Sequence, residues 1–125
     1  MNIVDSSCWL EYFSDSEVGN LVSGAIEDLS SLVVPSITIY EVFRKLLLEK
    51  NEDGALLAAA HMKQGRVVNL DSDISIFSAK IGRENGLPMA DSIIYATALK
   101  YNCILWTQDK HFKDLKNIRY FTKTN

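Results

Sequence analysis

The sequence predicts an α/β domain with a mostly parallel central sheet of four to five strands and helices on both faces. Short apolar runs at residues 3–4, 32–34, 66–70 and 103–106 are typical of buried strands, and a weaker run at 118–120 is expected to add a fifth. Stretches with helical spacing of apolar residues separate these runs. Such alternation of strands and helices favours a parallel sheet covered on both sides.

Each predicted helix begins and ends at a recognisable boundary. We expect Ser6 or Ser7 to cap the first helix and Ser36 to cap the one that follows Pro35. Asp71 or Ser72 is expected to cap a later helix. The predicted helices cover residues from 6 to 13, about 15 to 28, 36 to 47, about 55 to 64, 72 to about 84, and 91 to 101. In the first, Trp9, Tyr12 and Phe13 form an aromatic stripe on one face, which is more typical of core than of an interface.

The bulk properties of the chain describe an ordinary globular protein. It has 125 residues, of which 47% are hydrophobic and 23% charged, and we expect a single domain over residues 1–125. The net charge of −3 disfavours a passive nucleic-acid binder, but not an enzyme whose acidic centre binds metal. Cys8 and Cys103 lie in apolar stretches and are expected as buried free thiols. Because neither a leader nor a membrane span is apparent, we expect a cytoplasmic protein without membrane contact.

Four acidic residues occupy related positions in the predicted fold. Asp5 and Asp109 follow apolar strands, whereas Glu41 and Asp91 lie early in helices. In a doubly wound fold, the carboxyl ends of the strands and the first turns of the following helices share one edge. Carboxylates gathered there would repel one another, and a hard divalent cation such as Mg²⁺ or Mn²⁺ would remove that conflict. The pattern therefore predicts a metal site.

Each of these acids also has a local explanation. Asp5 suits a helix cap, Asp91 complements a helix dipole, and Asp109 suits a turn. Glu41 has Lys45 one turn further along the helix as a surface partner. For one acid alone the local explanation is favoured. Their shared placement favours a site.

Four segments carry a resemblance to a known family. They are Ile3–Ser7, Pro35–Val42, Gly86–Ala98 and Leu105–Phe112, and each contains one of the four acids. In this order they resemble the motifs of PIN-domain ribonucleases, and in particular the VapC toxins of toxin–antitoxin pairs. The resemblance extends from residue 3 to about residue 120. It implies a PIN-like three-layer fold.

The resemblance also implies a chemistry. The four acids would hold one or two Mg²⁺ or Mn²⁺ ions and support hydrolysis of RNA, in transfer or ribosomal RNA, leaving a 5′-phosphate and a 3′-hydroxyl. Ser7 and Thr107 are candidates for orienting a carboxylate or water, although cap and turn roles explain them equally well. Some relatives carry a further acid where this chain has Lys110 and His111, which leaves a second metal position open.

RNA binding requires cations near the acids. Lys110, Lys113 and Arg119 are the favoured candidates, with Arg44 and Arg83 weaker. Lys116 and Lys123 are expected on a solvated face, and His61 at the surface. The resemblance implies two protein partners: a cognate antitoxin, which in the family lies across a groove of the early helices, and a second copy of the chain in a homodimer.

Two other functions compete with the nuclease. A receiver-type signalling domain would take phosphate on Asp71, with Thr107 and Lys110 as switch residues. That reading gives Glu41 and Asp91 no role, and Asp71 is better explained as a helix cap. A PIN-like module that binds a partner without catalysis is the third hypothesis, and the presence of all four acids weighs against it.

Overall fold

The computed structural model describes residues 1–122 and contains five short parallel strands. The fifth strand, expected at residues 118–120, is present, and every strand pair is parallel. The strands are β1 (Asn2–Val4), β2 (Val33–Pro35), β3 (Arg66–Val68), β4 (Ile104–Thr107) and β5 (Ile118–Tyr120). The predicted α/β class is therefore confirmed.

The five strands form two ladders. β1, β4 and β5 pair in the order β1-β4-β5, and β2 pairs with β3. A single parallel bridge between Asn2 and Leu32 joins the two groups. The predicted central sheet is thus present, but it is divided between β1 and β2 because these short strands share only this bridge.

The helices fill the intervals between the strands. They are α1 (Ser6–Phe13), α2 (Glu17–Glu27), α3 (Ser36–Glu49), α4 (Glu52–Met62), α5 (Ser72–Asn85) and α6 (Met89–Lys100), with 3₁₀ turns η1 (Leu29–Ser31) and η2 (Lys110–Phe112). Asp71 caps α5, because its Oδ1 accepts the Ile74 N–H at 2.8 Å. Gly86 ends α5 in the left-handed region at φ 64°, which glycine adopts without strain.

Two of the predicted caps are wrong. α1 is capped by Asp5 rather than by Ser6 or Ser7, which are the first two helical residues, so the local explanation of Asp5 as a helix cap is confirmed. α3 begins at Ser36 itself, with Pro35 before it and no side-chain cap. In both places the strand leads directly into the helix, so the serines fall one position inside it.

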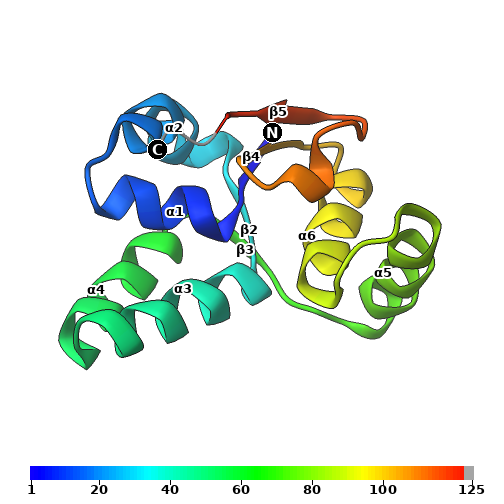
Figure 1. Ribbon diagram of the computed structural model, residues 1–125. Helices are drawn as coiled ribbons and strands as arrows, with labels where there is room; N and C mark the ends of the chain where they lie inside the picture. The colour runs from blue at the N-terminus through cyan, green and yellow to red at the C-terminus, as the bar shows by residue number, and fades with distance from the viewer. Residues whose placement is uncertain (123–125) are drawn as a thin grey trace.

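Two hydrophobic cores lie on opposite faces of the strands. Val4 and Val34 belong to the core under α1–α4, while their neighbours Ile3 and Val33 belong to the core under α5 and α6. Adjacent strand residues point to opposite faces, so this alternation places one helical layer on each side. Figure 1 shows α1, α3 and α4 on one side of the strands and α5 and α6 on the other.

Of the remaining predictions about single residues, most are confirmed and one is not. Cys8 and Cys103 are free and buried, as predicted. Trp9 is fully buried, and Tyr12 and Phe13 pack against the same core. His61 is not a plain surface residue, because its ring lies 5.5–6.2 Å from the rings of those three aromatic residues. In the described part of the chain, no helix is long and apolar enough to cross a membrane.

Candidate metal centre

The four acids lie where strands end or helices begin. Asp5 follows β1, and Asp109 lies two residues beyond the end of β4. Asp91 is in the first turn of α6, and Glu41 is in the second turn of α3, which continues directly from β2. The chain therefore presents carboxylates from four segments that the parallel strands carry towards one edge.

Asp5 is buried and held by hydrogen bonds. Its Oδ1 accepts the backbone N–H of Ser6 at 2.7 Å, and its Oδ2 accepts the Thr107 hydroxyl at 2.8 Å. Its own N–H donates to the carbonyl of Trp106 at 2.9 Å, which extends the ladder between β1 and β4. The residue is only 5% exposed. Both backbone and side chain of Asp5 are thus fixed before any ligand arrives.

Ser6 links Asp5 to Glu41. While its N–H donates to Asp5, its hydroxyl donates to Glu41 Oε1 at 2.6 Å. The surface pair considered for Glu41 is absent, because Lys45 instead pairs with Glu49 at 3.0 Å. Glu41 is therefore directed towards Asp5 and away from its own helix surface.

Thr107 organises two of the acids. Its hydroxyl donates to Asp5, and the same oxygen accepts the backbone N–H of Asp109 at 3.0 Å. Asp109 in turn begins the turn η2, where its Oδ1 accepts the N–H of His111 at 2.9 Å. One hydroxyl thus connects the end of β1 with the segment after β4.

Asp91, Asp109 and His111 form the exposed part of the cluster. His111 Nδ1 lies 2.9 Å from Asp91 Oδ2 and 3.0 Å from Asp109 Oδ1. One ligand atom from each of the three lies within 4.8 Å of the others. In the described residues, no group of three such side chains at this spacing includes Asp5 or Glu41.

The position of Asp91 depends on the packing of α6 against α5. Ser92, the next residue, donates its hydroxyl to the carbonyl of Pro88 at 2.8 Å. Opposite it stands Gly82 on α5, where a Cβ atom would overlap the Ser92 hydroxyl. The glycine therefore lets α5 approach the first turn of α6 closely.

Burial and mutual repulsion perturb the acids. Burial raises the pKa of Asp5 to about 7, with smaller opposing effects from its two hydrogen bonds and smaller raising effects from the charges of Asp91 and Glu41. Burial, and then the charge of Asp109, raises the pKa of Asp91 to about 6. The charge of Asp109, followed by the hydrogen bond to Asp91, raises the pKa of the His111 imidazole. The four acids thus influence one another although only two belong to the tight group.

These residues suit a divalent cation. Carboxylate oxygens are the ligands that Mg²⁺ and Mn²⁺ prefer, and the charge of a cation would offset the burial and the weaker mutual repulsion that raise the pKa values of Asp5 and Asp91. Asp5, Glu41, Asp91 and Asp109 supply these oxygens.

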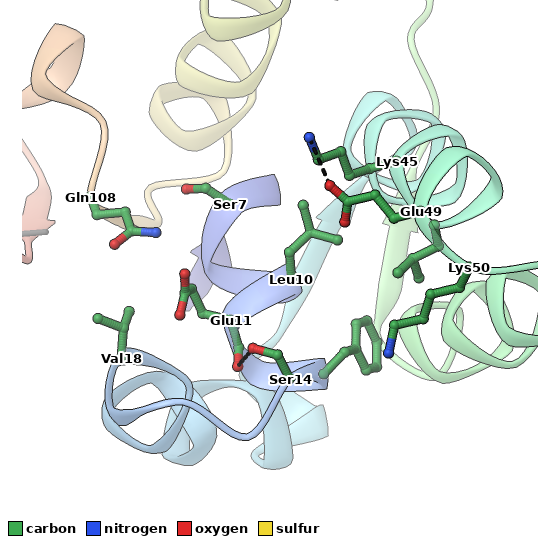
Figure 2. A pocket seen from close by; sticks show the side chains of 11 residues that line it. Ser7, Leu10, Glu11, Ser14, Val18, Lys45, Glu49, Lys50 and Gln108 are labelled. Atoms are coloured by element: carbon green, nitrogen blue, oxygen red, sulfur yellow. Dashed lines mark hydrogen bonds and ion pairs between the residues drawn. The ribbon is translucent and has the colours of Figure 1, made fainter. Parts of the chain in front are cut away.

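Ser7 does not make the contact that was expected of it. Its Oγ is buried and has no hydrogen-bond partner among the described residues, because Ser7 lies about 100° further round α1 than Ser6. It lines a neighbouring pocket of about 470 Å³ between α1 and α3. Figure 2 shows Ser7 and Gln108 at one end of this pocket and Lys45, Glu49 and Lys50 at the other.

The candidate RNA-binding cations differ in their surroundings. Lys110, Lys113 and Arg44 are exposed, and Arg44 lies one turn after Glu41 on α3. Lys113 Nζ lies 5.7 Å from the Tyr120 ring. The Arg119 guanidinium lies over Trp106 and Phe121, at 5.0 and 5.8 Å from the ring centres. Arg83 lines a pocket between α5 and α6, Lys116 is exposed, and Lys123 lies outside the described residues.

The sequence interpretation underestimated two residues of the site. Ser6 was considered only as a cap, and His111 only as a residue found where some relatives carry a further acid. The available signal was the same for both: each lies within two residues of a predicted metal ligand. Sequence spacing alone does not tell which side chain of such a pair turns inward.

Comparisons with known proteins agree with this architecture. The PIN domain family matches residues 3–118. No curated protein sequence matches the chain. Several solved structures share the fold at sequence identities under 25%.

One is a toxin–antitoxin complex from Klebsiella pneumoniae, with 21% identity, a TM-score of 0.78, and 95% of this chain and 96% of that chain covered. Another is VapC20 of Mycobacterium tuberculosis, described as a sarcin-ricin loop cleaving toxin, with 15% identity, a TM-score of 0.75 and coverage of 93% and 95%. A DNA-bound VapBC from Salmonella typhimurium has 17% identity, a TM-score of 0.73 and coverage of 97% and 98%.

The family match spans nearly the whole chain and includes all four acids. It leaves the receiver interpretation without support, and Asp71 serves as a helix cap. The solved structures agree in fold, and the resemblance first noted in the four motifs is confirmed. The chain belongs to the PIN domain family.

Proposed function

We propose that this protein is a metal-dependent endoribonuclease and the toxin of a toxin–antitoxin pair, acting on transfer or ribosomal RNA. The observation that carries the proposal is the convergence of Asp5, Glu41, Asp91 and Asp109 at one edge, with Asp5 buried and fixed. Burying a carboxylate whose pKa is raised to about 7 lowers the stability of the fold at neutral pH. Groups perturbed in this way are often functional, which favours a role for Asp5 in a site. The PIN family match and the fold shared with VapC20 support the same activity.

The side chains divide the work of such a site. Asp5, Glu41, Asp91 and Asp109 would hold the cation, which when bound lowers the pKa of a water ligand and neutralises charge on the scissile phosphate. Thr107 and Ser6 fix the orientation of Asp5, so the site is arranged before substrate binds. This division requires no nucleophilic side chain, because water is the attacking group.

Cations beside the acids would hold the RNA backbone. Lys110 and Lys113 follow Asp109 and are exposed, so their ammonium groups are free to reach phosphates. Arg44 is exposed on α3 beyond Glu41. Arg119 would contribute with its guanidinium already placed on two aromatic rings. Single-stranded loops suit this arrangement, because their phosphates and bases are accessible.

The pocket between α1 and α3 fits the proposed antitoxin. It is lined by apolar Leu10 and Phe13 together with acids and lysines, and it begins at Ser7 and Gln108, which adjoin the metal centre in sequence. An antitoxin segment lying there would approach the acids from the side of α1 (Figure 2). A homodimer is proposed from the family resemblance.

The test is cleavage of total cellular RNA by the antitoxin-free protein, with new 5′-phosphate ends mapped. Reactions contain Mn²⁺ or Mg²⁺, or a chelator, and they compare wild type with Asp91→Asn. Asp73→Asn is the matched control, because Asp73 is an exposed aspartate in the first turn of another helix. We expect discrete ends that require metal, disappear in Asp91→Asn and persist in Asp73→Asn.

Two results would contradict the proposal. Cleavage that survives in Asp91→Asn would show that the acids are not the catalytic centre. Failure of the folded wild type to cut any RNA while it still binds Mn²⁺ would favour the non-catalytic binding module. Circular dichroism of each variant establishes that the fold is intact.

A further inference from the structure

His111 contacts two of the four acids, and a metal site built only from carboxylates does not explain its position. Its Nδ1 approaches Asp91 Oδ2 and Asp109 Oδ1, which come from different elements of the fold. The ring is the most exposed member of the three, with 54% of its side chain accessible, so packing against a core does not explain its position. The contacts to the acids do.

The two distances from His111 Nδ1 to the acids match the spacing of neighbouring ligands around one ion. An octahedral cation with ligands at about 2.1 Å separates neighbouring ligand atoms by about 3.0 Å. His111 Nδ1 lies 2.9 and 3.0 Å from the two carboxylate oxygens, and one ligand atom from each of the three residues falls within 4.8 Å of the others. The same spacing suits hydrogen bonds in the metal-free protein, so a cation can replace the shared proton without a large movement of the ring.

We propose that His111 is itself a metal ligand, and that its nitrogen makes the centre prefer Mn²⁺ over Mg²⁺. This inference rests on the proposed function, because it assumes that the acids bind a divalent cation. Imidazole nitrogen is a poor ligand for Mg²⁺, which favours oxygen, whereas transition-metal ions accept nitrogen readily. A site of four carboxylates alone would discriminate less between the two ions.

The chain offers a clean background for this test. It contains two histidines, and the other, His61, lies among Trp9, Tyr12 and Phe13 in the aromatic cluster of α1 and α4. A nitrogen signal from a bound ion can therefore be assigned by a single substitution. Protein without a histidine tag is required.

The experiment measures Mn²⁺ binding to the RNA-free protein by electron paramagnetic resonance. Pulsed spectra detect coupling between Mn²⁺ and a directly bound ¹⁴N nucleus, and protein containing [¹⁵N]histidine assigns that nucleus to imidazole. Titrations give the affinities for Mn²⁺ and, by competition, for Mg²⁺. The variants are His111→Ala, Lys116→Ala as the control at an exposed residue outside the proposed site, and Asp91→Asn.

We expect imidazole coupling in wild type and Lys116→Ala and none in His111→Ala. The Mn²⁺ affinity should fall roughly 10-fold or more in His111→Ala, while the Mg²⁺ affinity changes less than about threefold. If Asp91→Asn loses Mn²⁺ but wild type shows no imidazole coupling, the acids bind metal and the inference about His111 is overturned. If wild type binds no Mn²⁺, or Asp91→Asn binds it normally, the metal centre of the proposed function fails, and this inference fails with it.

Discussion

The two halves of the proposed metal centre are built differently. The inner half comprises Asp5, Ser6, Glu41 and Thr107, and the outer half comprises Asp91, Asp109 and His111. In the inner half Asp5 is 5% exposed, and neutral hydroxyl and N–H donors hold it. In the outer half the side chains of Asp91 and Asp109 are 15% and 31% exposed, and an ionisable imidazole lies between them.

This difference suggests separate roles for the two halves, one in positioning the cation and the other in selecting it. In the proposed centre, the inner half would fix where a cation sits, because its donors come from the start of α1 and the end of β4. The outer half would determine which cation is preferred and how substrate reaches it, because its groups are accessible and include an imidazole. Changes to either half, or to the hydroxyl that connects them, test this difference.

The largest effect is expected from pH on the stability of the metal-free protein. The folded-state pKa values of Asp5 and Asp91 are raised, so the folded protein binds more protons than the unfolded chain between about pH 4 and pH 7. Stability therefore falls as pH rises through this window. The raised pKa of His111 acts in the same direction, because stability from its charged form is lost as pH rises through the folded-state value.

For Asp5 alone the expected loss between about pH 5 and pH 7.5 is roughly 2–3 kcal/mol, since one pKa unit corresponds to about 1.4 kcal/mol. Urea denaturation with a chelator measures it. Asp5→Asn should flatten the dependence, and Mn²⁺ should restore stability at about pH 7.5. Stability that rises with pH in the chelated wild type would show that the inner acid is not strained by its burial.

A second prediction removes the hydroxyl that connects the two halves. Thr107→Val keeps the shape but removes the donor to Asp5 and the acceptor for the Asp109 N–H. We expect a loss of about 2–3 kcal/mol in unfolding free energy and a 10- to 100-fold loss of RNA cleavage. Thr107→Ser is the control and should retain most of both. Equal RNA cleavage by the valine and serine variants would show that the Thr107 hydroxyl does not contribute to the site.

A third comparison sets the two adjacent serines against each other. Ser6→Ala removes the hydroxyl that donates to Glu41, and about 1 kcal/mol of stability should be lost, with reduced cleavage. Ser7→Ala removes a buried hydroxyl that has no partner in the described residues, so stability should stay the same or rise slightly. If Ser7→Ala lowered stability and cleavage more than Ser6→Ala did, Ser7 rather than Ser6 would belong to the inner half.

The smallest effect concerns the cations beside the outer half. In the Asp91→Asn background, which is not expected to cut RNA, Lys110→Ala should lower the salt dependence of single-stranded RNA binding by roughly 0.7 in log–log slope. Arg119→Ala should change stability as well, because its guanidinium packs on Trp106 and Phe121. Fluorescence anisotropy at several salt concentrations measures the slopes, and urea denaturation measures the stability of Arg119→Ala. Identical slopes for Asp91→Asn with and without Lys110→Ala would exclude a phosphate contact.

Much of the fold followed from local patterns. The apolar runs located all five strands, and Asp71, one of two expected caps, marked the start of α5, because strand burial and helix capping depend on neighbouring residues. The division of the sheet between β1 and β2 did not follow, because hydropathy shows which runs are strands but not how many ladder bonds they share. The cap at Asp5 was shifted by one residue for a related reason: the strand enters the helix without a connecting turn.

The site was predictable at the level of elements more than of contacts. The four acids were identified from their places at strand ends and helix starts, and their roles as ligands stay predictions. Ser6 and Ser7 are indistinguishable in sequence, and only the rotation of α1 directs one to Glu41 and the other to the pocket. The contacts of His111 depend on the turn η2 and on the packing of α6, which no local pattern encodes.

Gly82 limits how this protein can vary over generations. Replacing glycine by alanine in a helix interior ordinarily stabilises the helix by about 0.5–1 kcal/mol, so this substitution is usually tolerated. Here the added methyl group would push Ser92, and the residue beside Ser92 is Asp91. In the proposed centre, Gly82 would contact neither cation nor RNA, yet it is constrained through Asp91. Gly82→Ala would then lower activity even though alanine favours the helix.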